Sequence, residues 1–342
     1  MISNIIQKIM KHDTLTENEA YFFMENLAKG NVTDAEASSV LSIMSFRGET
    51  VDEIAGFVKA IRYLSKEADP SHQQELMDTC GTGGDGASTF NISTAVSIIL
   101  ASLGIKVAKH GNKAVTSKSG SSDVLEALGI SAATNHYEAN SQLLKHDIAF
   151  LHAPYFHPSL KKVAFLRQQL PFRTIFNSIG PLLNPMSPSY QLIGASNEKV
   201  AKKLAEVIKV LGIKRALIVS GKEGLDECSI TGDTVMFLVE NNTITNFIFT
   251  PEDAGLKRGN LSDLTVKNKH ESAELIRSIL QGVGNESARN IVILNAAAAL
   301  FASKRVSSIR DGAEIIKQCL QSRSAYYHLQ EMTKREANVH VN

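Results

Sequence analysis

A glycine-rich loop at residues 78–86, DTCGTGGDG, constrains the fold of this chain more than any other feature. The residues that lead into it, ELMDT, are typical of a short strand, and FNISTAVSIILASL after it is typical of a helix that ends at Gly104. Glycines in such a loop let an anion approach free backbone amides at the positive end of a helix dipole. The sequence therefore predicts a strand, a phosphate-binding loop and a helix in succession, with an ordinary tight turn as the alternative.

Strand and helix patterns alternate along the rest of the chain. Further strands are predicted at residues 105–110, 148–152 and 215–221, and helices at 197–212 and 288–303. This alternation implies a largely parallel sheet covered by helices. Two β-rich runs on either side of Glu240, Asn241 and Asn242 predict one antiparallel hairpin.

The N-terminal region carries only helical patterns. Three capping boxes, each a threonine followed three residues later by a glutamate, predict helix starts at Thr16 with Glu19, Thr33 with Glu36, and Thr50 with Glu53. The polar stretch EADPSHQQ at 67–74 is typical of a linker. We therefore predict a fold of the α/β class with two parts. A helical bundle spans 1–72 and is joined by a helical segment near 160–187, and a larger α/β domain spans 73–159 and 188–342.

Length, charge and cysteine content limit the function. The 342 residues, 43% of them apolar, suffice for two domains and a sizeable core. With 36 Lys and Arg against 35 Asp and Glu, the total charge indicates neither a nucleic-acid partner nor a membrane surface. The three cysteines lack metal-ligand spacing, which favours a reducing compartment, and no apolar run approaches the roughly 18 residues that span a bilayer. We expect a cytoplasmic protein without nucleic-acid or membrane partners.

The spacing of Gly81, Gly83 and Gly86 also matches G-x-G-x-x-G, a pattern of dinucleotide-binding folds. Those folds need an acidic residue about 20 positions on, at the end of the next strand, to bind ribose hydroxyls. This sequence has cations there instead, at Lys109 and Lys113, followed by a second loop rich in hydroxyl groups. Two anion-binding loops at neighbouring strand ends predict a small ligand that carries two phosphate groups.

Four stretches together resemble the signatures of the anthranilate phosphoribosyltransferase family: GTGGDGASTFNISTA, KHGNKAVTSKSGSSDVLEALG, HPSLKKVAFLRQQLPFRTIFNSIGPLLNP and GLDECS. The resemblance covers nearly the whole chain. It implies a pentosyltransferase of tryptophan biosynthesis that transfers the phosphoribosyl group of phosphoribosyl pyrophosphate (PRPP) to the amine of anthranilate. The products are N-(5-phosphoribosyl)anthranilate and pyrophosphate. The family commonly dimerises through its helical domain, so the resemblance also implies a homodimer.

The resemblance assigns PRPP to two segments of the larger, phosphoribosyl-binding domain. This chain has Lys113 where the family commonly has arginine, so a bidentate phosphate contact becomes a single one. The implied PRPP-binding residues are Gly81, Gly84, Asp85, Thr89, Asn91, Ile92, Ser93 and Thr94 in the first segment, and Lys109, His110, Gly111, Asn112, Lys113, Ala114, Val115, Thr116, Ser117 and Ser121 in the second. From the residues alone, Asn91, Ser93 and Thr94 could equally cap a helix.

The family binds magnesium, and the resemblance carries that site to Ser93, Asp226 and Glu227. Magnesium typically takes one or two carboxylates together with phosphate oxygens and water, which suits a pyrophosphate leaving group. Taken alone, adjacent acids such as Asp226 and Glu227 are more typical of a solvated surface.

For anthranilate, the resemblance points to Gly81, Asn112 and Arg167, with His110, His157 and the Gly180-Pro181 turn close by. An arginine can pair with the anthranilate carboxylate through two parallel hydrogen bonds, although a helical arginine often only faces solvent. Pro171 stands where the family usually has glycine. We assign no general base, because the amine is already nucleophilic and His110 could be structural.

Two alternatives remain at the level of sequence. Pyrimidine nucleoside phosphorylases share the architecture and have similar glycine and lysine loops, but the pair of Asp226 and Glu227 and the stretch HPSLKKVAFLR favour the transferase. A nucleic-acid-binding relative of the same fold would use the basic loops on backbone phosphates, but the near-neutral charge disfavours it.

Overall fold

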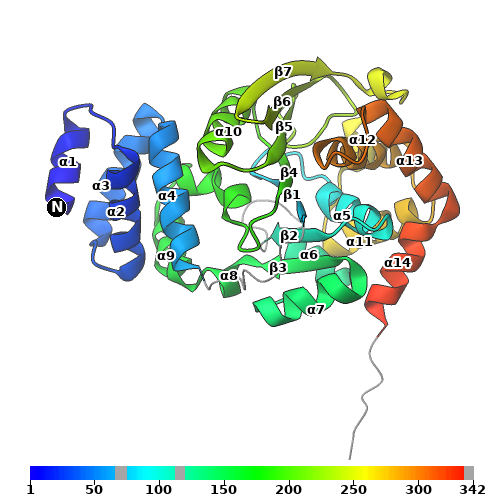
Figure 1. Cartoon of the computed structure of the whole chain (residues 1–342), viewed down its shortest axis with the longest axis horizontal. Coiled ribbons are helices and arrows are strands. Elements are labelled where there is room, and N and C mark those ends of the chain that lie inside the picture. The colour runs from blue at the N-terminus through cyan, green and yellow to red at the C-terminus, as the bar shows by residue number, and fades with distance from the viewer. Residues whose placement is uncertain (66–74, 112–119, 335–342) are drawn as a thin grey trace, which may run out of the picture.

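The computed structural model describes residues 1–65, 75–111 and 120–334. Four N-terminal helices form a bundle beside a larger body in which helices cover a twisted sheet (Figure 1). This arrangement confirms the predicted fold class. None of the described helices is long and apolar enough to span a membrane.

The bundle consists of α1 (Ile2–Met10), α2 (Glu17–Lys29), α3 (Asp34–Arg47) and α4 (Val51–Leu64). All three predicted capping boxes are confirmed, since each threonine side chain accepts a hydrogen bond from the backbone of its glutamate and each glutamate side chain accepts one in return. Helix α2 then ends at Gly30, whose left-handed φ of 81° is favourable for glycine. Local sequence therefore sets the helix boundaries of the bundle.

Glu53 does more than cap α4. Its side chain is fully buried, and Oε1 accepts hydrogen bonds from the Leu15 amide at 2.9 Å and from Nη2 of Arg47 at 2.5 Å. Its other oxygen accepts the capping bond from the Thr50 amide at 2.8 Å. One buried carboxylate thus connects α4, the end of α3 and the loop between α1 and α2.

The sheet has the strand order β3-β2-β1-β4-β5-β6-β7. The first five strands in this order are parallel, and β6 and β7 are antiparallel. The predicted hairpin is confirmed: Asn241 and Asn242 form its turn with φ of 49° and 60°, values that asparagine tolerates. The strands are β1 (Met77–Gly81), β2 (Val107–Gly111), β3 (Ile148–His152), β4 (Tyr190–Gly194), β5 (Arg215–Gly221), β6 (Thr234–Glu240) and β7 (Thr243–Phe249).

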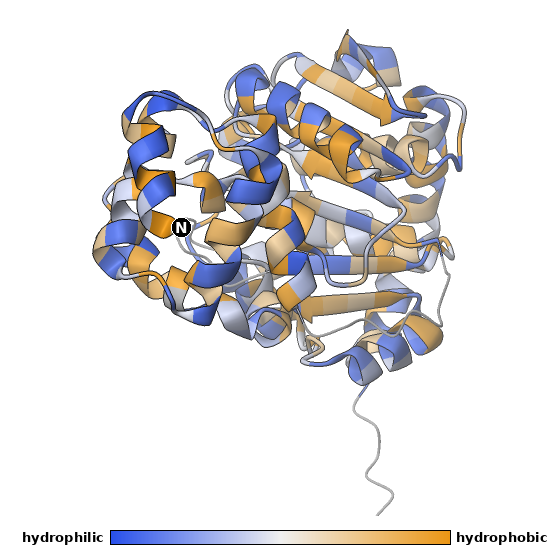
Figure 2. Cartoon of the chain, turned by 60° about the vertical axis from the view of Figure 1, so that its left-hand side comes forward, coloured by the Kyte–Doolittle hydropathy of each residue, from blue (hydrophilic) through white to orange (hydrophobic). Residues whose placement is uncertain are grey.

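Both faces of the sheet are covered, because its side chains alternate between two cores. Leu217 and Val219 of β5 belong to the core that contains α5 (Ile92–Ser102) and α12 (Glu286–Ala302), whereas Ala216 and Ile218 belong to the core that contains α10 (Glu198–Leu211) and the bundle. Figure 2 shows the corresponding apolar strands beneath amphipathic helices. Outside 153–187, the other described helices are α6 (Ser121–Leu128), α7 (His136–His146), α11 (Lys269–Leu280), α13 (Ile309–Ser322) and α14 (Ser324–Thr333), with 3₁₀ turns η4 (Pro251–Ala254) and η5 (Leu261–Leu264).

The segment predicted as helical near 160–187 is not one helix. After α8 (Ala153–Phe156) it forms a 3₁₀ turn η1 (Pro158–Leu160), one helix α9 (Lys161–Gln169), and two further 3₁₀ turns, η2 (Ile175–Asn177) and η3 (Gly180–Leu183). Helix α9 stops because Leu170 precedes Pro171 and is extended, with φ −94° and ψ 114°. The segment nevertheless packs on the bundle, with α9 against α2, η2 against α3 and η3 against α4.

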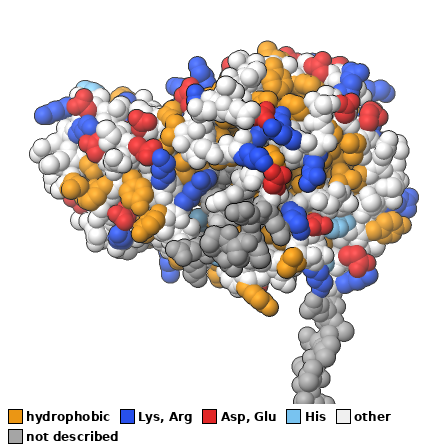
Figure 3. All heavy atoms as spheres, in the orientation of Figure 1, with side chains coloured by type: hydrophobic (Ala, Val, Ile, Leu, Met, Phe, Trp, Pro, Cys, Tyr) orange, Lys and Arg blue, Asp and Glu red, His pale blue; other side chains and the backbone are white. Residues whose placement is uncertain are grey.

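The bundle and the sheet share one core, since Ile54 of α4 and Ile193 of β4 belong to the same cluster. The predicted linker at 67–74 lies outside the described residues, so the division of the chain at residue 72 stays a prediction. Four large apolar side chains of the bundle and α9 are exposed: Met10, Phe46, Tyr63 and Phe165. Figure 3 shows hydrophobic side chains on the surface of the bundle.

Glu53→Gln is expected to lower the free energy of unfolding by about 3 kcal/mol, because it leaves the Arg47 guanidinium without its buried anion. Glu36→Gln, in the exposed capping box of α3, is the matched control and should cost less than about 1 kcal/mol. Denaturant unfolding of both variants and the wild type measures the two values. Equal losses would contradict the connecting role of Glu53.

Candidate active site

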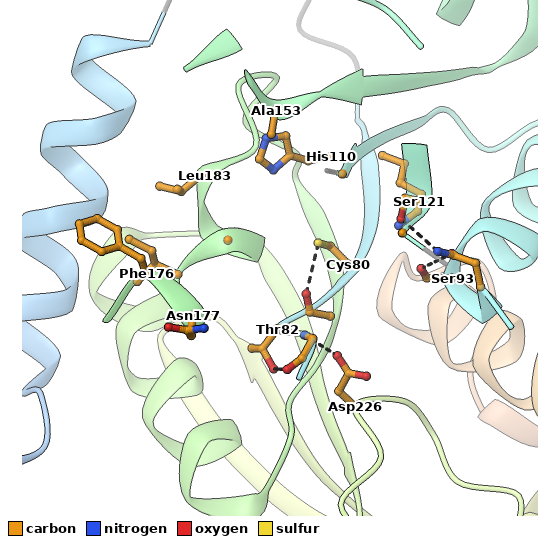
Figure 4. A pocket seen from close by; sticks show the side chains of 18 of the residues that line it. Cys80, Thr82, Ser93, His110, Ser121, Ala153, Phe176, Asn177, Leu183 and Asp226 are labelled. Carbon is orange, nitrogen blue, oxygen red and sulfur yellow. Dashed lines mark hydrogen bonds between the residues drawn. The ribbon is translucent and has the colours of Figure 1, made fainter. Parts of the chain in front are cut away.

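A cavity of about 730 Å³ lies at the carboxyl ends of β1 and β2, where open α/β sheets commonly bind ligands. One wall comes from the glycine loop and the start of α5, and another from α9, η2 and η3 (Figure 4). Most of the sequence-predicted site residues that the structure describes line it: Gly81, Asp85, Thr89, Asn91, Ile92, Ser93, Lys109, His110, Gly111, Ser121, Arg167, Asp226 and Glu227.

The other predicted residues do not line this cavity or cannot be placed. Gly84 lies in the glycine loop but outside the cavity lining, and Thr94 is fully buried behind it. Asn112, Lys113, Ala114, Val115, Thr116 and Ser117 lie outside the described residues.

Asn91 joins the two predicted phosphate-binding segments. It is the N-cap of α5, and its Oδ1 accepts hydrogen bonds from the Thr94 amide at 3.0 Å and from Ser93 Oγ at 3.2 Å. Its Nδ2 donates to Ser121 Oγ, in the first turn of α6, at 3.3 Å. Capping and ligand binding are therefore not exclusive here, because the same side chain orders the helix start and brings both segments to one cavity.

The loop that carries Asp226 crosses the ends of β1 and β4 at very short range. Gly81 and Gly194 are paired across these strands, and a Cβ atom on Gly194 would lie 1.6 Å from the Asp226 carbonyl oxygen. A Cβ atom on Gly81 would lie 2.3 Å from Oδ2 of Asp226. Two glycines thus permit the approach, which lets the Gly83 amide donate to Asp226 Oδ2 at 2.6 Å (Figure 4).

Asp226 and Glu227 bring two buried carboxyl groups together at one side of the cavity. Burial raises the pKa of Asp226 well above its usual value, and the nearby Asp85 raises it further. Burial also raises the pKa of Glu227, with Asp226 as the second cause. Among the described residues, no group of three or more His, Cys, Asp or Glu side chains is arranged to hold a metal ion. Together with the Ser93 hydroxyl, the two acids offer the hard oxygen atoms that magnesium prefers, and a bound ligand would have to complete the set.

Lys109 is 2% exposed, and its ammonium donates to the Thr79 carbonyl at 2.5 Å. It lies near Asp78, whose pKa burial raises to about 6 while Lys109 and Asn184 lower it. Asn184 binds the carboxylate of Asp78 at 2.8 Å and the Ala108 carbonyl at 2.7 Å. Lys109 therefore lines the cavity, and its ammonium is bound to a backbone carbonyl in the middle of β1, so its role toward PRPP stays a prediction.

His110 and His157 meet edge to face, with ring centroids 5.3 Å apart. Burial lowers the pKa of His110 to about 3 and that of His157 to about 4, so both rings are neutral near pH 7. Nε2 of His157 donates to the Leu183 carbonyl at 2.8 Å. His110 Nε2 and His157 Nδ1 are buried and have no hydrogen-bond partner in the described part of the chain.

Arg167 enters the cavity from α9. Burial lowers its pKa from the usual value, and no carboxylate of the described residues forms an ion pair with it. A partly buried cation without a carboxylate partner, next to a cavity, is suited to an anionic ligand. Phe176, Asn177 and Leu183 lie across from the glycine loop in the same cavity (Figure 4).

Sequence reasoning missed Arg173, Phe176 and Asn177. Arg173 donates to the carbonyls of Gly84 at 3.3 Å and Gly83 at 3.2 Å, so it holds the outer side of the glycine loop. All three residues lie within the stretch 157–185 that carries the family resemblance. That stretch is irregular, so no periodicity indicated which of its side chains face the cavity.

Two family matches cover most of the chain. Residues 3–65 match a glycosyl transferase family, helical bundle domain, and residues 73–326 match a glycosyl transferase family, a/b domain. Bundle, sheet and cavity therefore define a glycosyl transferase of this two-part class.

Similar proteins of known name identify the family of this chain within the glycosyl transferase class. The chain is 45% identical over 336 residues to the anthranilate phosphoribosyltransferase of Geobacillus kaustophilus (strain HTA426), with 98% of each sequence covered. The chain belongs to the anthranilate phosphoribosyltransferase family, which confirms the resemblance of its motifs.

Solved structures agree with this result. The enzyme of that name from Thermus thermophilus is 34% identical, with a TM-score of 0.89 and coverage of 96% of this chain and 98% of that one. Anthranilate phosphoribosyltransferase from Saccharomyces cerevisiae, in complex with PRPP and Mg, is 26% identical, with a TM-score of 0.88 and coverage of 97% and 96%.

Gly194→Ala is expected to destabilise the protein by about 3 kcal/mol, because the new methyl group displaces the backbone at Asp226. Gly232→Ala, in the loop between β5 and β6 that carries Asp226, is the matched control. A Cβ atom there has ordinary contacts of 3.5 Å and longer, so this substitution should cost less than about 1 kcal/mol. Denaturant unfolding measures both. Amide exchange at Gly83 should accelerate only in Gly194→Ala, and unchanged exchange there would contradict the proposed packing.

Proposed function

We propose that the protein transfers the phosphoribosyl group of PRPP to the amine of anthranilate, releasing pyrophosphate, as a step of tryptophan biosynthesis. One observation carries the proposal: two segments suited to phosphate meet at a cavity that also contains an arginine without a carboxylate partner among the described residues and a pair of acids. Membership of the anthranilate phosphoribosyltransferase family supports the choice of substrates.

PRPP carries phosphoryl groups at two positions, and each segment receives one of them. At the first segment, the amides of the glycine loop and the positive end of α5 attract an anion, and Asn91 and Ser93 add polar groups. At the second segment, the end of β2 and the start of α6 take the other, with Ser121 as a hydroxyl donor. The ribose then lies between them.

Ser93, Asp226 and Glu227 would hold a magnesium ion. The fit rests on their chemistry, since two crowded carboxylates whose charged forms burial disfavours are stabilised by a cation. When bound, magnesium supplies charge neutralisation to the departing pyrophosphate. The Mg bound with PRPP in the yeast structure supports this assignment.

Arg167 holds the carboxylate of anthranilate, and Gly81 and Asn112 complete that site. The amine then attacks the anomeric carbon while pyrophosphate leaves, through a transition state with oxocarbenium character. The protein contributes mainly orientation and charge stabilisation. His110 is neutral at pH 7 and is not needed to activate an amine that is already nucleophilic, so no general base is assigned.

We also propose that two copies associate through the bundle, because large side chains such as Phe46, 93% exposed, and Tyr63, 72% exposed, leave apolar surface there. A cytoplasmic location accords with the three free cysteines, Cys80, Cys228 and Cys319. The bundle over 1–72 and the α/β part over 73–159 and 188–342 are proposed as the two domains. A nucleoside phosphorylase or a nucleic-acid-binding role is disfavoured by the relatives that the chain matches.

Incubating the protein with anthranilate, PRPP and magnesium is expected to abolish anthranilate fluorescence, and omission of PRPP or chelation of the metal should prevent the decay. Asp226→Asn with Glu227→Gln should lose most of the metal-dependent rate, by about a hundredfold or more. Fluorescence that persists in the complete mixture, or thymine release from thymidine and phosphate, would reject the proposal.

Arg167→Ala is expected to raise KM for anthranilate by at least about tenfold, since it removes the cation that pairs with the substrate carboxylate. KM for PRPP should change little. Gln168→Ala, the neighbouring position on α9 outside the cavity, is the matched control. Steady-state kinetics with each substrate varied in turn measures the difference. An equal rise in both KM values would contradict the assignment of Arg167 to the anthranilate site.

A further inference from the structure

Side chains from three different parts of the fold bind successive carbonyls of the turn η3, Gly180–Leu183. Gln191 of β4 donates to Pro181 at 2.9 Å, Arg62 of α4 donates to Leu182 at 2.8 Å, and His157 donates to Leu183 at 2.8 Å. The backbone of Gly180 also faces His110 of β2 and partly offsets the effect of burial on the pKa of that histidine. A single short turn thus receives donors from the bundle, the sheet and the segment between α8 and η1.

This turn is also a wall of the cavity. Gly180 and Leu183 line it, together with Ile179 just before the turn. The residue after the turn, Asn184, is fixed to Asp78 and to the Ala108 carbonyl in the sheet. The sheet therefore holds one end of the turn, while Arg62 is the donor that reaches it from the bundle.

Arg62 carries its charge into the contact between the bundle and η3. It is partly buried, and burial lowers its pKa to about 10, so the side chain remains a cation at neutral pH. No carboxylate of the described residues pairs with it, unlike Lys59 one turn earlier on α4, which pairs with Glu17 at 2.6 Å. Its Nε donates to the Leu182 carbonyl, and hydrogen bonds from charged donors are stronger than neutral ones.

We propose that Arg62 is a positioning residue for the aromatic acceptor, because it fixes, from the helical bundle, the η3 turn that forms the wall of the cavity beside His110 and His157. The proposal rests on the function proposed above. Arg62 does not line the cavity, so it acts through the turn and not by touching substrate. The bundle thereby contributes to the acceptor end of the site without supplying a group that binds PRPP.

The state of His157 supports this role. Burial is the main cause of its lowered pKa, and the positive charge of Arg62 lowers the pKa further. His157 faces the ring of His110, which is also neutral, and donates to the carbonyl next to the one that Arg62 binds. Arg62 thus fixes the backbone of the wall at Leu182, and its charge adds to the burial that keeps His157 neutral.

The test compares Arg62→Met, Arg62→Lys and Lys59→Met with the wild type. Arg62→Met should raise KM for anthranilate by about tenfold, with KM for PRPP changed less than about twofold. Arg62→Lys keeps the charge and one donor, so it should recover most of the loss. Lys59→Met removes a cation from the same helix whose partner lies within the bundle, and it should leave both KM values unchanged.

A second measurement does not depend on turnover. The imidazole of His157, followed by NMR during a pH titration, should titrate at higher pH in Arg62→Met than in the wild type or in Lys59→Met. Thermal melting of each variant separates loss of folding from loss of positioning. If Arg62→Met is poorly folded, Arg62→Gln, which also removes the charge, replaces it in both measurements with the same expected changes.

An equal rise in both KM values, or wild-type anthranilate kinetics in a folded Arg62→Met, would overturn the role of Arg62 alone. A wild-type protein that does not consume anthranilate with PRPP would instead overturn the proposed function, and the acceptor role with it.

Discussion

The loop that carries Asp226 passes very close to the ends of β1 and β4, and the candidate site depends on this contact. It requires two positions without side chains, and Gly81 and Gly194 are paired at that level of the sheet. The result is a carboxylate within hydrogen-bond distance of the glycine loop, at Gly83. Without that approach the two acids would lie apart from the glycine loop.

The cavity combines charges that are only partly compensated. Asp226 and Glu227 lie on one side, where burial disfavours their charged forms, and Arg167 lies on α9 without a carboxylate partner among the described residues. Two neutral histidines lie beside the η3 wall. Such an arrangement suits a ligand with a phosphoryl end and a metal ion, together with a second, carboxylate-bearing molecule.

Several elements could be predicted because their causes are local. The capping boxes at Thr16, Thr33 and Thr50 place three helix starts, and the strands at 148–152 and 215–221 are found with the predicted bounds. The segment near 160–187 could not be predicted in the same way. Pro171 and Pro181 are local signals against one continuous helix, but the 3₁₀ turns themselves are held by side chains from distant elements, and no periodicity of the segment's own residues places them.

The sequence by itself determined the helix starts, the strands, the glycine loop and, through its motifs, the family, because each of these depends on neighbours a few residues apart. Only the tertiary structure decided which groups meet. Asp226 and Gly83 are 143 positions apart, and Arg62 and Leu182 are 120 apart. Contacts at such separations depend on how the sheet, the bundle and the loops pack together, and no local pattern of residues encodes that packing.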